Sequence, residues 1–168
     1  MFLSADELKS RVGELGAEIA REYAGRDLLL VSLLKASFVF LTDLSRAISI
    51  PHAIDFVELA GYNGADTGGH SRVRLLKDTA IPVTGHDVLL VEDVVDTGLT
   101  LNYLQEILRA RNPRRLRTAC LLSKPSRRQV DVKVEYIGFT IEDRFVVGYG
   151  LDYAEQYRNL PHIAVLGS

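Results

Sequence analysis

The chain has 168 residues, 47% hydrophobic and 25% charged, which is enough for one full hydrophobic core and predicts a single domain over 1–168. A net charge of −2 at pH 7 excludes a global positive field for holding a nucleic-acid backbone, so an anionic partner must bind at a local site. Cys120 is the only cysteine, which excludes an internal disulfide, and the apolar run 28–34 is too short to span a membrane. We therefore expect a soluble, cytoplasmic protein that binds neither membranes nor nucleic acid.

The first third of the chain predicts a helix, a buried strand and a second helix. Ser4 and Glu7 form a capping box, and apolar residues then recur at helical spacing until Gly25. Residues 28–34 predict a buried strand because the run is short and almost wholly apolar. A helical pattern over 38–47 completes a strand-loop-helix unit.

The middle of the chain predicts a strand pair joined by a glycine-rich loop. Residues 54–60 predict one strand and 72–77 the returning strand. Four glycines in GYNGADTGGHS, residues 61–71, cannot pack a core and predict a mobile loop. A short buried strand over 88–91 precedes a helix from about Leu99 that carries a leucine stripe.

Three further strands are predicted over 117–122, 135–139 and 163–166. Strands that alternate with helices, with no repeat or linker between them, are typical of an α/β domain. Its sheet is mainly parallel and has helices on both faces. In such sheets ligands bind at the carboxyl ends of the strands, so we expect a site there.

The stretch VLLVEDVVDTGLT, residues 88–100, predicts an anion site. It is an apolar strand followed by a loop that enters a helix, and such a loop offers unpaired backbone N–H groups and the positive end of the helix dipole. Thr97 and Thr100 add hydroxyl donors, and Gly98 permits close approach. This combination fits a phosphate monoester.

Three carboxylates, Glu92, Asp93 and Asp96, accompany this anion site. Helix capping explains the threonines and the glycine but not the acids, which would repel a phosphate if they had no other role. A ribose 5-phosphate resolves the conflict, because the acids can accept hydrogen bonds from its ring hydroxyls while the loop holds the phosphate.

The stretch resembles the phosphoribosyl pyrophosphate signature of type I phosphoribosyltransferases. Four further segments are similar to the hypoxanthine-guanine branch of that family: LKAS at 34–37, the glycine-rich loop, LLSKPSRR, and FVVGYGLDY with Arg158 beyond it. The resemblance implies a mainly parallel central sheet flanked by helices, with a small hood region. It places a flexible hood loop at about 61–71, where Tyr62 would cover the reacting sugar, and a base-binding hood at about 124–168.

The resemblance also implies roles for individual residues. The phosphoribosyl group would be bound by Glu92, Asp93, Asp96, Thr97, Gly98, Leu99 and Thr100. Pyrophosphate would be bound by Lys35, Ala36 and Arg158. The purine would be bound by Lys124, Phe145, Val146 and Asp152. From the residues alone, Phe145 and Val146 predict the core of a strand and both lysines predict exposed surface.

Asp96 is the expected catalytic residue, which takes or shares the proton on purine N7. Mg²⁺ is the expected cofactor, held by Glu92, Asp93 and Asp152 together with substrate oxygens. Relatives typically have glycine where this chain has Ala36, and they carry a non-proline cis peptide at this loop. Gly61 and Glu142 also depart from the family's serine and proline.

The implied function is purine salvage: transfer of the 5-phosphoribosyl group from phosphoribosyl pyrophosphate to hypoxanthine or guanine, by a homodimer or homotetramer. One alternative is an enzyme that prefers xanthine or guanine. Another is an RNA-binding regulator with the same fold, for which the chain offers a basic run: Arg109, Arg111, Arg114, Arg115 and Arg117.

Overall fold

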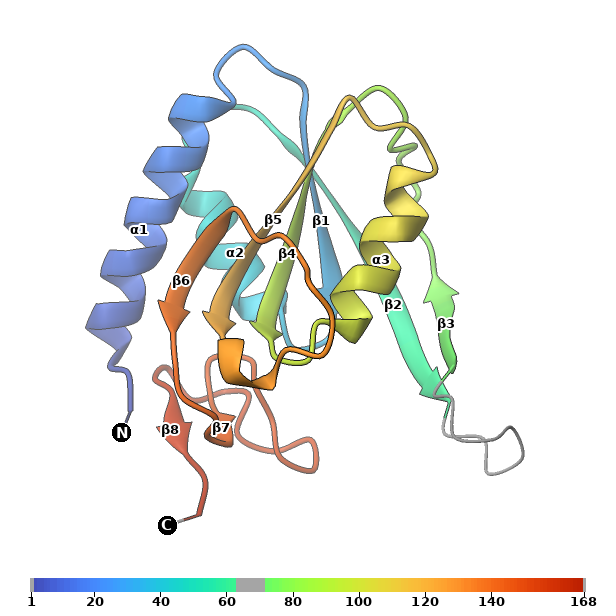
Figure 1. Ribbon diagram of the computed structural model, residues 1–168. Helices are drawn as coiled ribbons and strands as arrows, with labels where there is room; N and C mark the ends of the chain where they lie inside the picture. Colours follow the sequence, from blue (N-terminus) through green and yellow to red (C-terminus); the bar gives the residue numbers. More distant parts are fainter. Residues whose placement is uncertain (1, 63–71, 168) are drawn as a thin grey trace.

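The computed structural model describes residues 2–62 and 72–167, which form a six-stranded sheet with helices on both faces and a separate two-stranded sheet (Figure 1). The helices are α1 (Ala5–Glu22), α2 (Phe38–Ala47) and α3 (Leu99–Arg109), and a short 3-10 helix is η1 (Pro125–Arg127). The strands are β1 (Leu28–Leu34), β2 (Ala53–Tyr62), β3 (Arg72–Lys77), β4 (Asp87–Val95), β5 (Arg115–Ser123), β6 (Tyr136–Thr140), β7 (Val146–Val147) and β8 (Ala164–Val165). The predicted α/β class with a mainly parallel sheet is confirmed.

The large sheet has the strand order β3-β2-β1-β4-β5-β6. Strands β2, β1, β4, β5 and β6 run parallel to one another, and the edge strand β3 pairs antiparallel with β2. The chain adds β2 on one side of β1 and β4 on the other, so the strand order reverses between β1 and β4. A crevice for ligands forms at such a switch point, outside the carboxyl ends of the strands.

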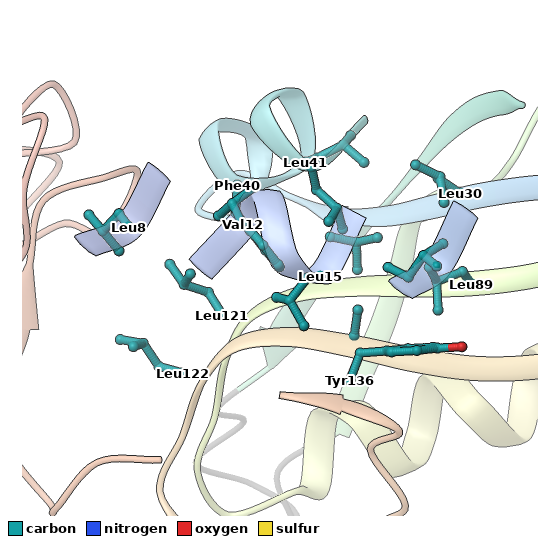
Figure 2. Packing of buried hydrophobic residues seen from close by; sticks show 14 of the residues in the cluster. Leu8, Val12, Leu15, Leu30, Phe40, Leu41, Leu89, Leu121, Leu122 and Tyr136 are labelled. Atoms are coloured by element: carbon teal, nitrogen blue, oxygen red, sulfur yellow. The ribbon is translucent and has the colours of Figure 1, made fainter. Parts of the chain in front are cut away.

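Helix α1 begins where the capping box predicts it. The Ser4 hydroxyl accepts a hydrogen bond from the Glu7 N–H at 3.1 Å, and the Glu7 carboxylate accepts one from the Ser4 N–H at 2.7 Å. Leu8, Val12 and Leu15 then form a buried stripe against α2 and the sheet (Figure 2). In the part of the chain that the structure describes, no helix is long and apolar enough to cross a membrane.

The core has two layers because successive residues of a strand point to opposite faces of the sheet. Leu28 and Leu30 of β1 pack in the cluster beneath α1 and α2, whereas Leu29 and Val31 pack beneath α3. All four side chains are buried, and burial of each stabilises the fold by roughly 1.5–3 kcal/mol relative to an exposed position. Figure 1 shows α1 and α2 on one side of the sheet and α3 on the other.

Three predicted boundaries are corrected by the structure. Strand β4 continues to Val95, so the strand does not end with Glu92 and Asp93 as predicted. Strand β2 continues to Tyr62, so the predicted loop begins later than residue 61. The predicted strand 163–166 is reduced to β8. This strand follows β6, the last strand of the large sheet, and pairs with β7 in the small sheet.

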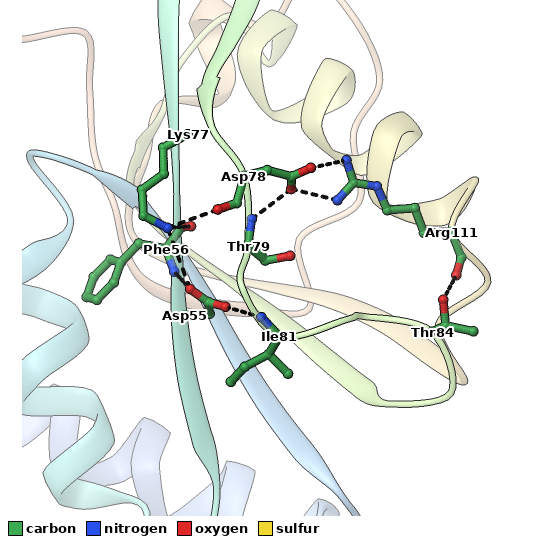
Figure 3. A network of polar contacts seen from close by, with 8 residues as sticks. All are labelled: Asp55, Phe56, Lys77, Asp78, Thr79, Ile81, Thr84 and Arg111. Carbon is green, nitrogen blue, oxygen red and sulfur yellow. Dashed lines mark hydrogen bonds and ion pairs between the residues drawn. The ribbon is translucent and has the colours of Figure 1, made fainter.

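A polar network ties the β2-β3 edge to the chain after α3 (Figure 3). Asp55 accepts hydrogen bonds from the N–H groups of Phe56 at 2.8 Å and Ile81 at 2.7 Å. Asp78 accepts two from the Arg111 guanidinium, at 2.6 and 2.7 Å, and these bonds hold the pKa of the Asp78 carboxyl below its usual value. The two parallel hydrogen bonds fix the orientation of the Arg111 guanidinium relative to the Asp78 carboxylate and strengthen the pair.

Arginines of the basic run make contacts within the fold. Arg111 takes part in the network just described, Arg117 pairs with Glu22 of α1 at 2.7 Å, and the Arg115 guanidinium lies 5.6 Å above the ring of Tyr23. These residues lie at the amino ends of the parallel strands, at the edge opposite the crevice. The structure therefore adds nothing in favour of an RNA-binding role for this run.

Candidate active site

The predicted site segments lie at the carboxyl ends of β1 and β4, where the strand order reverses. Residues 35–37 follow β1, and residues 96–98 follow β4. Figure 1 shows the segment that carries β7 and β8 beyond these same strand ends. The fold therefore brings together three segments that are far apart in the sequence.

The loop that enters α3 has the geometry of an anion site. Gly98 is the N-cap with a φ of 83°, and a Cβ atom there would lie 3.1 Å from Val132 and 3.2 Å from the Val130 carbonyl oxygen. Only glycine fits this position, and it has no side chain with which to cap the helix. The Thr97 hydroxyl accepts a hydrogen bond from the Leu99 N–H at 3.3 Å, and Thr100 is exposed at the first turn.

Glu92 is the most deeply buried acid of the site. Its side chain is 4% exposed, and within the described residues its Oε1 atom has no hydrogen-bond partner. Burial raises the pKa of Glu92 well above its ordinary value, and the charges of Asp93 and Asp96 raise it further. A cavity of about 30 Å³ lies between Glu92, Asp96, Gly98 and the first residues of α3.

Asp93 points to the opposite face of β4 from Glu92 because adjacent strand residues alternate. Burial raises the pKa of its carboxyl, while the N–H groups of Val94 and of Asp93 itself and the charge of Arg158 oppose that rise. Arg158 therefore acts electrostatically on β4 from the C-terminal segment. Asp96 is half-buried, and its carboxylate accepts a hydrogen bond from the Thr97 N–H at 2.5 Å.

The loop after β1 lies against the C-terminal segment. The peptide bond between Leu34 and Lys35 is cis, as the family resemblance implies, and Ser37 is buried with its hydroxyl bonded to Ser32 at 2.7 Å. A Cβ atom at Gly150, which has a φ of 96°, would lie 2.4 Å from the Ala36 carbonyl oxygen. The missing side chain of Gly150 thus permits the approach of Ala36 to the FVVGYGLDY segment.

Predicted pyrophosphate residues meet acids of the C-terminal segment. Arg158 donates to the Gly150 carbonyl at 2.7 Å and lies 3.4 Å from Asp152 and 3.2 Å from Glu155. Lys35 lies 3.3 Å from the other oxygen of Glu155. The structure therefore joins Lys35, Arg158 and Asp152 into one cluster through Glu155.

The other predicted base-binding residues are Lys124, which follows β5, and Phe145 and Val146, at the start of β7. The Lys124 ammonium donates to the Arg144 carbonyl at 2.7 Å and lies 3.9 Å from Asp143. The strand pattern places Phe145 in the core, but its side chain is 53% exposed. Its ring contacts that of Tyr153 edge to face, with the ring centroids 5.9 Å apart. Val146, in contrast, is buried in β7.

The acids of the site fit a magnesium ion whose coordination a substrate completes. The Oε1 atom of Glu92 is buried and has no hydrogen-bond partner among the described residues, and a carboxylate oxygen is the kind of ligand that Mg²⁺ prefers. This ion usually binds through one or two carboxylates plus substrate phosphates. Across residues 2–62 and 72–167, no three His, Cys, Asp or Glu side chains form a group that could hold a metal alone. Glu92, Asp93 and Asp152 are therefore not gathered into a closed ligand set.

The hood loop lies mostly outside the described residues. Residues 63–71 and the side chain of Tyr62 belong to that part, so the roles predicted for Tyr62 and the loop stay predictions. The backbone of Tyr62 is described and pairs with Arg72 in the β2-β3 hairpin.

Three residues near the site were missed by the sequence reasoning. Tyr153 and Glu155 stand in or beside the recognised FVVGYGLDY string, but their contacts depend on how the segment turns back. Arg128 donates to the carbonyl oxygens of Val95 and Asp96, both at 2.7 Å, and so supports the end of β4 from the segment that carries Lys124. Its position in SKPSRR was the only available signal.

The fold is that of an α/β enzyme, with a glycine-capped loop and three neighbouring acids, one of them buried, at the switch point of its sheet. The sequence profile of the phosphoribosyl transferase domain matches residues 3–154. The chain belongs to this family.

Curated relatives and solved structures agree with the family. The chain is 47% identical to a hypoxanthine phosphoribosyltransferase of Salmonella typhimurium, over 94% of this chain and 89% of the relative. It is 45% identical to a hypoxanthine-guanine phosphoribosyltransferase of Mycobacterium tuberculosis, over 99% and 85% of the two chains. A hypoxanthine phosphoribosyltransferase structure from Staphylococcus aureus matches with a TM-score of 0.94 and 39% identity, over 99% of this chain and 90% of that chain.

Proposed function

We propose that this enzyme transfers the 5-phosphoribosyl group from phosphoribosyl pyrophosphate to hypoxanthine or guanine and releases IMP or GMP with pyrophosphate. The observation that carries the proposal is the placement of the anion loop and its acids at the same strand ends as the Lys35–Arg158 cluster, whose Arg158 charge acts on Asp93, and next to the Lys124 segment. The backbone N–H of Lys124 donates to the Val95 carbonyl at 2.9 Å. This bond joins the segment that carries Lys124 directly to the end of β4.

The phosphoribosyl group is assigned to the loop after β4. The phosphate would bind at the N-terminus of α3, where backbone N–H groups and the helix dipole favour an anion, with Thr97, Gly98, Leu99 and Thr100 around it. The ribose hydroxyls would donate hydrogen bonds to Glu92 or Asp93. Pyrophosphate would bind at the far side of the sugar to Lys35, the backbone of Ala36 and Arg158.

The purine is assigned to Lys124, Phe145 and Val146. The exposed ring of Phe145 offers a surface on which a base can stack, and the Val146 backbone would hydrogen-bond its edge. Lys124 would donate to the oxygen at position 6. Asp152, in the same segment, would contribute to the base site and to the metal.

In the reaction, the bond from the anomeric carbon to pyrophosphate breaks as a bond to purine N9 forms, with positive charge on the sugar in between. Glu92 and Asp93 favour that charge electrostatically, one of them through the ribose hydroxyls and the other, on the opposite face of β4, through water or Mg²⁺. Asp96 accepts the proton from purine N7, which makes the attacking ring more electron-rich. Glu92, Asp93 and Asp152 would hold Mg²⁺ together with substrate oxygens, and its charge would offset that of the leaving pyrophosphate.

The proposal extends to the whole chain and its setting. Residues 1–168 form one domain, with a hood loop at about 61–71 and a base-binding hood at about 124–168. The hydrogen bond from the Phe2 N–H to the Ile163 carbonyl, at 2.8 Å, supports this unity because it joins both ends of the chain. The enzyme works in the cytoplasm as a homodimer or homotetramer. Sedimentation velocity measures the oligomeric state.

A base-competition assay tests the assignment. With phosphoribosyl pyrophosphate and Mg²⁺, equal concentrations of hypoxanthine, guanine, xanthine and adenine compete for the enzyme, and the nucleotides are separated. Hypoxanthine or guanine is expected to dominate, because the 6-amino group of adenine donates where Lys124 also donates. Adenine turnover equal to that of hypoxanthine contradicts the base pocket, and dominance of xanthine supports the xanthine-preferring alternative.

A further inference from the structure

Glu155 bridges the two cations to which the proposed function assigns pyrophosphate. Its Oε2 atom lies 3.3 Å from the Lys35 ammonium, and its Oε1 atom lies 3.2 Å from the Arg158 guanidinium. Lys35 follows β1, whereas Arg158 lies in the C-terminal segment, so a single carboxylate spans the gap between them. Under the proposed function, the same two cations would bind phosphate oxygens of pyrophosphate.

The backbone holds Glu155 in this position by an uncommon turn. The N–H and C=O groups of Tyr153 and Gln156 bond to each other at 3.1 and 2.9 Å, so that Ala154 and Glu155 form the centre of a two-residue hairpin. Both central residues have positive φ, 51° and 64°, where glycine and asparagine are the usual residues. Asp152 accepts the Glu155 N–H at 2.9 Å and fixes the turn. Left-handed residues of this kind cluster at ligand-binding segments.

The bridge is suited to displacement. The side chains of Lys35 and Glu155 are 60% and 62% exposed, so both ion pairs are solvated and weak. Arg158 is only 18% exposed and stays in place through its bond to the Gly150 carbonyl. A doubly or triply charged phosphate group therefore competes with a weak internal carboxylate for cations that are already positioned.

We propose that the Glu155 carboxylate occupies the pyrophosphate position of the free enzyme and must be displaced by pyrophosphate, so that it weakens binding and speeds release of this group. This inference rests on the proposed function, which assigns pyrophosphate to Lys35 and Arg158. Glu155 is thus a residue that sets affinity for the leaving group and for phosphoribosyl pyrophosphate, and it takes no part in bond breaking.

Calorimetric titration with inorganic pyrophosphate and Mg²⁺ tests this role. We compare the wild type with Glu155→Gln and Glu155→Ala, and we use Glu14→Gln as the matched control. Glu14 is 63% exposed and pairs with Arg11 on α1 at 2.8 Å, so the control removes a similar solvated ion pair outside the cluster. We expect Kd for pyrophosphate to fall about 3- to 10-fold in both Glu155 variants, on the scale of weak exposed pairs, and to stay unchanged in the control.

The kinetics give the second readout. The KM for phosphoribosyl pyrophosphate is expected to fall in the Glu155 variants, and pyrophosphate is expected to become a stronger product inhibitor. Unchanged or weaker pyrophosphate binding in both Glu155 variants, with the wild type still binding it, overturns the inference and leaves the proposed function standing. A wild type that forms nucleotide from no base overturns the proposed function itself and this inference with it.

Discussion

Three acids at the end of β4 would carry the chemistry proposed for this enzyme. Glu92, Asp93 and Asp96 lie close enough for the negative charge of one to raise the pKa of another. Such mutual repulsion is costly in a folded chain, and acids that keep it are often functional. Here a substrate sugar and a divalent ion would relieve the repulsion, because hydroxyl donors and a cation both stabilise ionised carboxylates.

Asp96→Asn is expected to keep phosphoribosyl pyrophosphate binding and lower turnover by roughly 100-fold or more, the usual scale for a positioned acid-base group. Asparagine has almost the shape of aspartate, and its side-chain oxygen can still accept the Thr97 N–H, which Asp96 binds at 2.5 Å. It cannot take the N7 proton. Single-turnover kinetics measure the chemical step, and a loss below about tenfold would mean that Asp96 only structures the loop.

Glu92→Gln is expected to stabilise the metal-free protein as the pH rises. Burial raises the folded-state pKa of Glu92 above the ordinary value of 4.5, so above pH 4.5 the unfolded chain is ionised while the folded chain keeps the proton. Stability is therefore lost with rising pH through this window, by at most about 1.4 kcal/mol per pH unit. Glutamine abolishes that loss.

Urea unfolding without divalent cations, at intervals from pH 4 to pH 8, measures the effect of this substitution. The free energy of unfolding of Glu92→Gln should exceed that of the wild type by an amount that grows with pH. A difference that stays constant across the series contradicts a raised pKa at Glu92.

At the scale of elements, the sequence predicted which helices and strands form but not how the last segment folds back. Periodicity and the Ser4 capping box were sufficient for α1, β1 and α2, because those signals are local. The contact of Gly150 with Ala36 and the bridge from Lys35 to Glu155 join residues more than 100 positions apart. Such contacts depend on the packing of the whole fold and have no local pattern.

Gly150→Ala tests the element contact that closes the crevice. The new Cβ atom would lie 2.4 Å from the Ala36 carbonyl oxygen, and the φ of 96° disfavours any side chain. We expect a loss of about 1–3 kcal/mol in unfolding free energy, together with a higher KM for phosphoribosyl pyrophosphate. Gly13→Ala in α1, with no atom within 4 Å of its new Cβ, is the control and should be stabilising by roughly 0.5–1 kcal/mol.

At the scale of the molecule, the site depends on the strand order of the sheet. The reversal between β1 and β4 opens the crevice, and the chain returns after β6 to place the base-binding segment beyond the same strand ends. Alternation of helices and strands predicted the α/β class, and the acidic stretch 88–100 predicted the end of β4 as the site. The predicted strand 163–166 and the strand pattern at Phe145 and Val146 overlap β8 and β7, but the pairing of these two strands in a separate small sheet could not be predicted, because two residues a strand carry no signal of the partner.

The formation of IMP from hypoxanthine is the direct test of phosphoribosyl transfer by this enzyme. The purified enzyme is incubated with phosphoribosyl pyrophosphate, hypoxanthine and Mg²⁺, and IMP and pyrophosphate are both quantified against a reaction that lacks the base. We expect both products to appear in equal amounts and chelation of the metal to stop the reaction. Pyrophosphate released without IMP, or no turnover of any purine base, would contradict the assignment of this crevice to phosphoribosyl transfer.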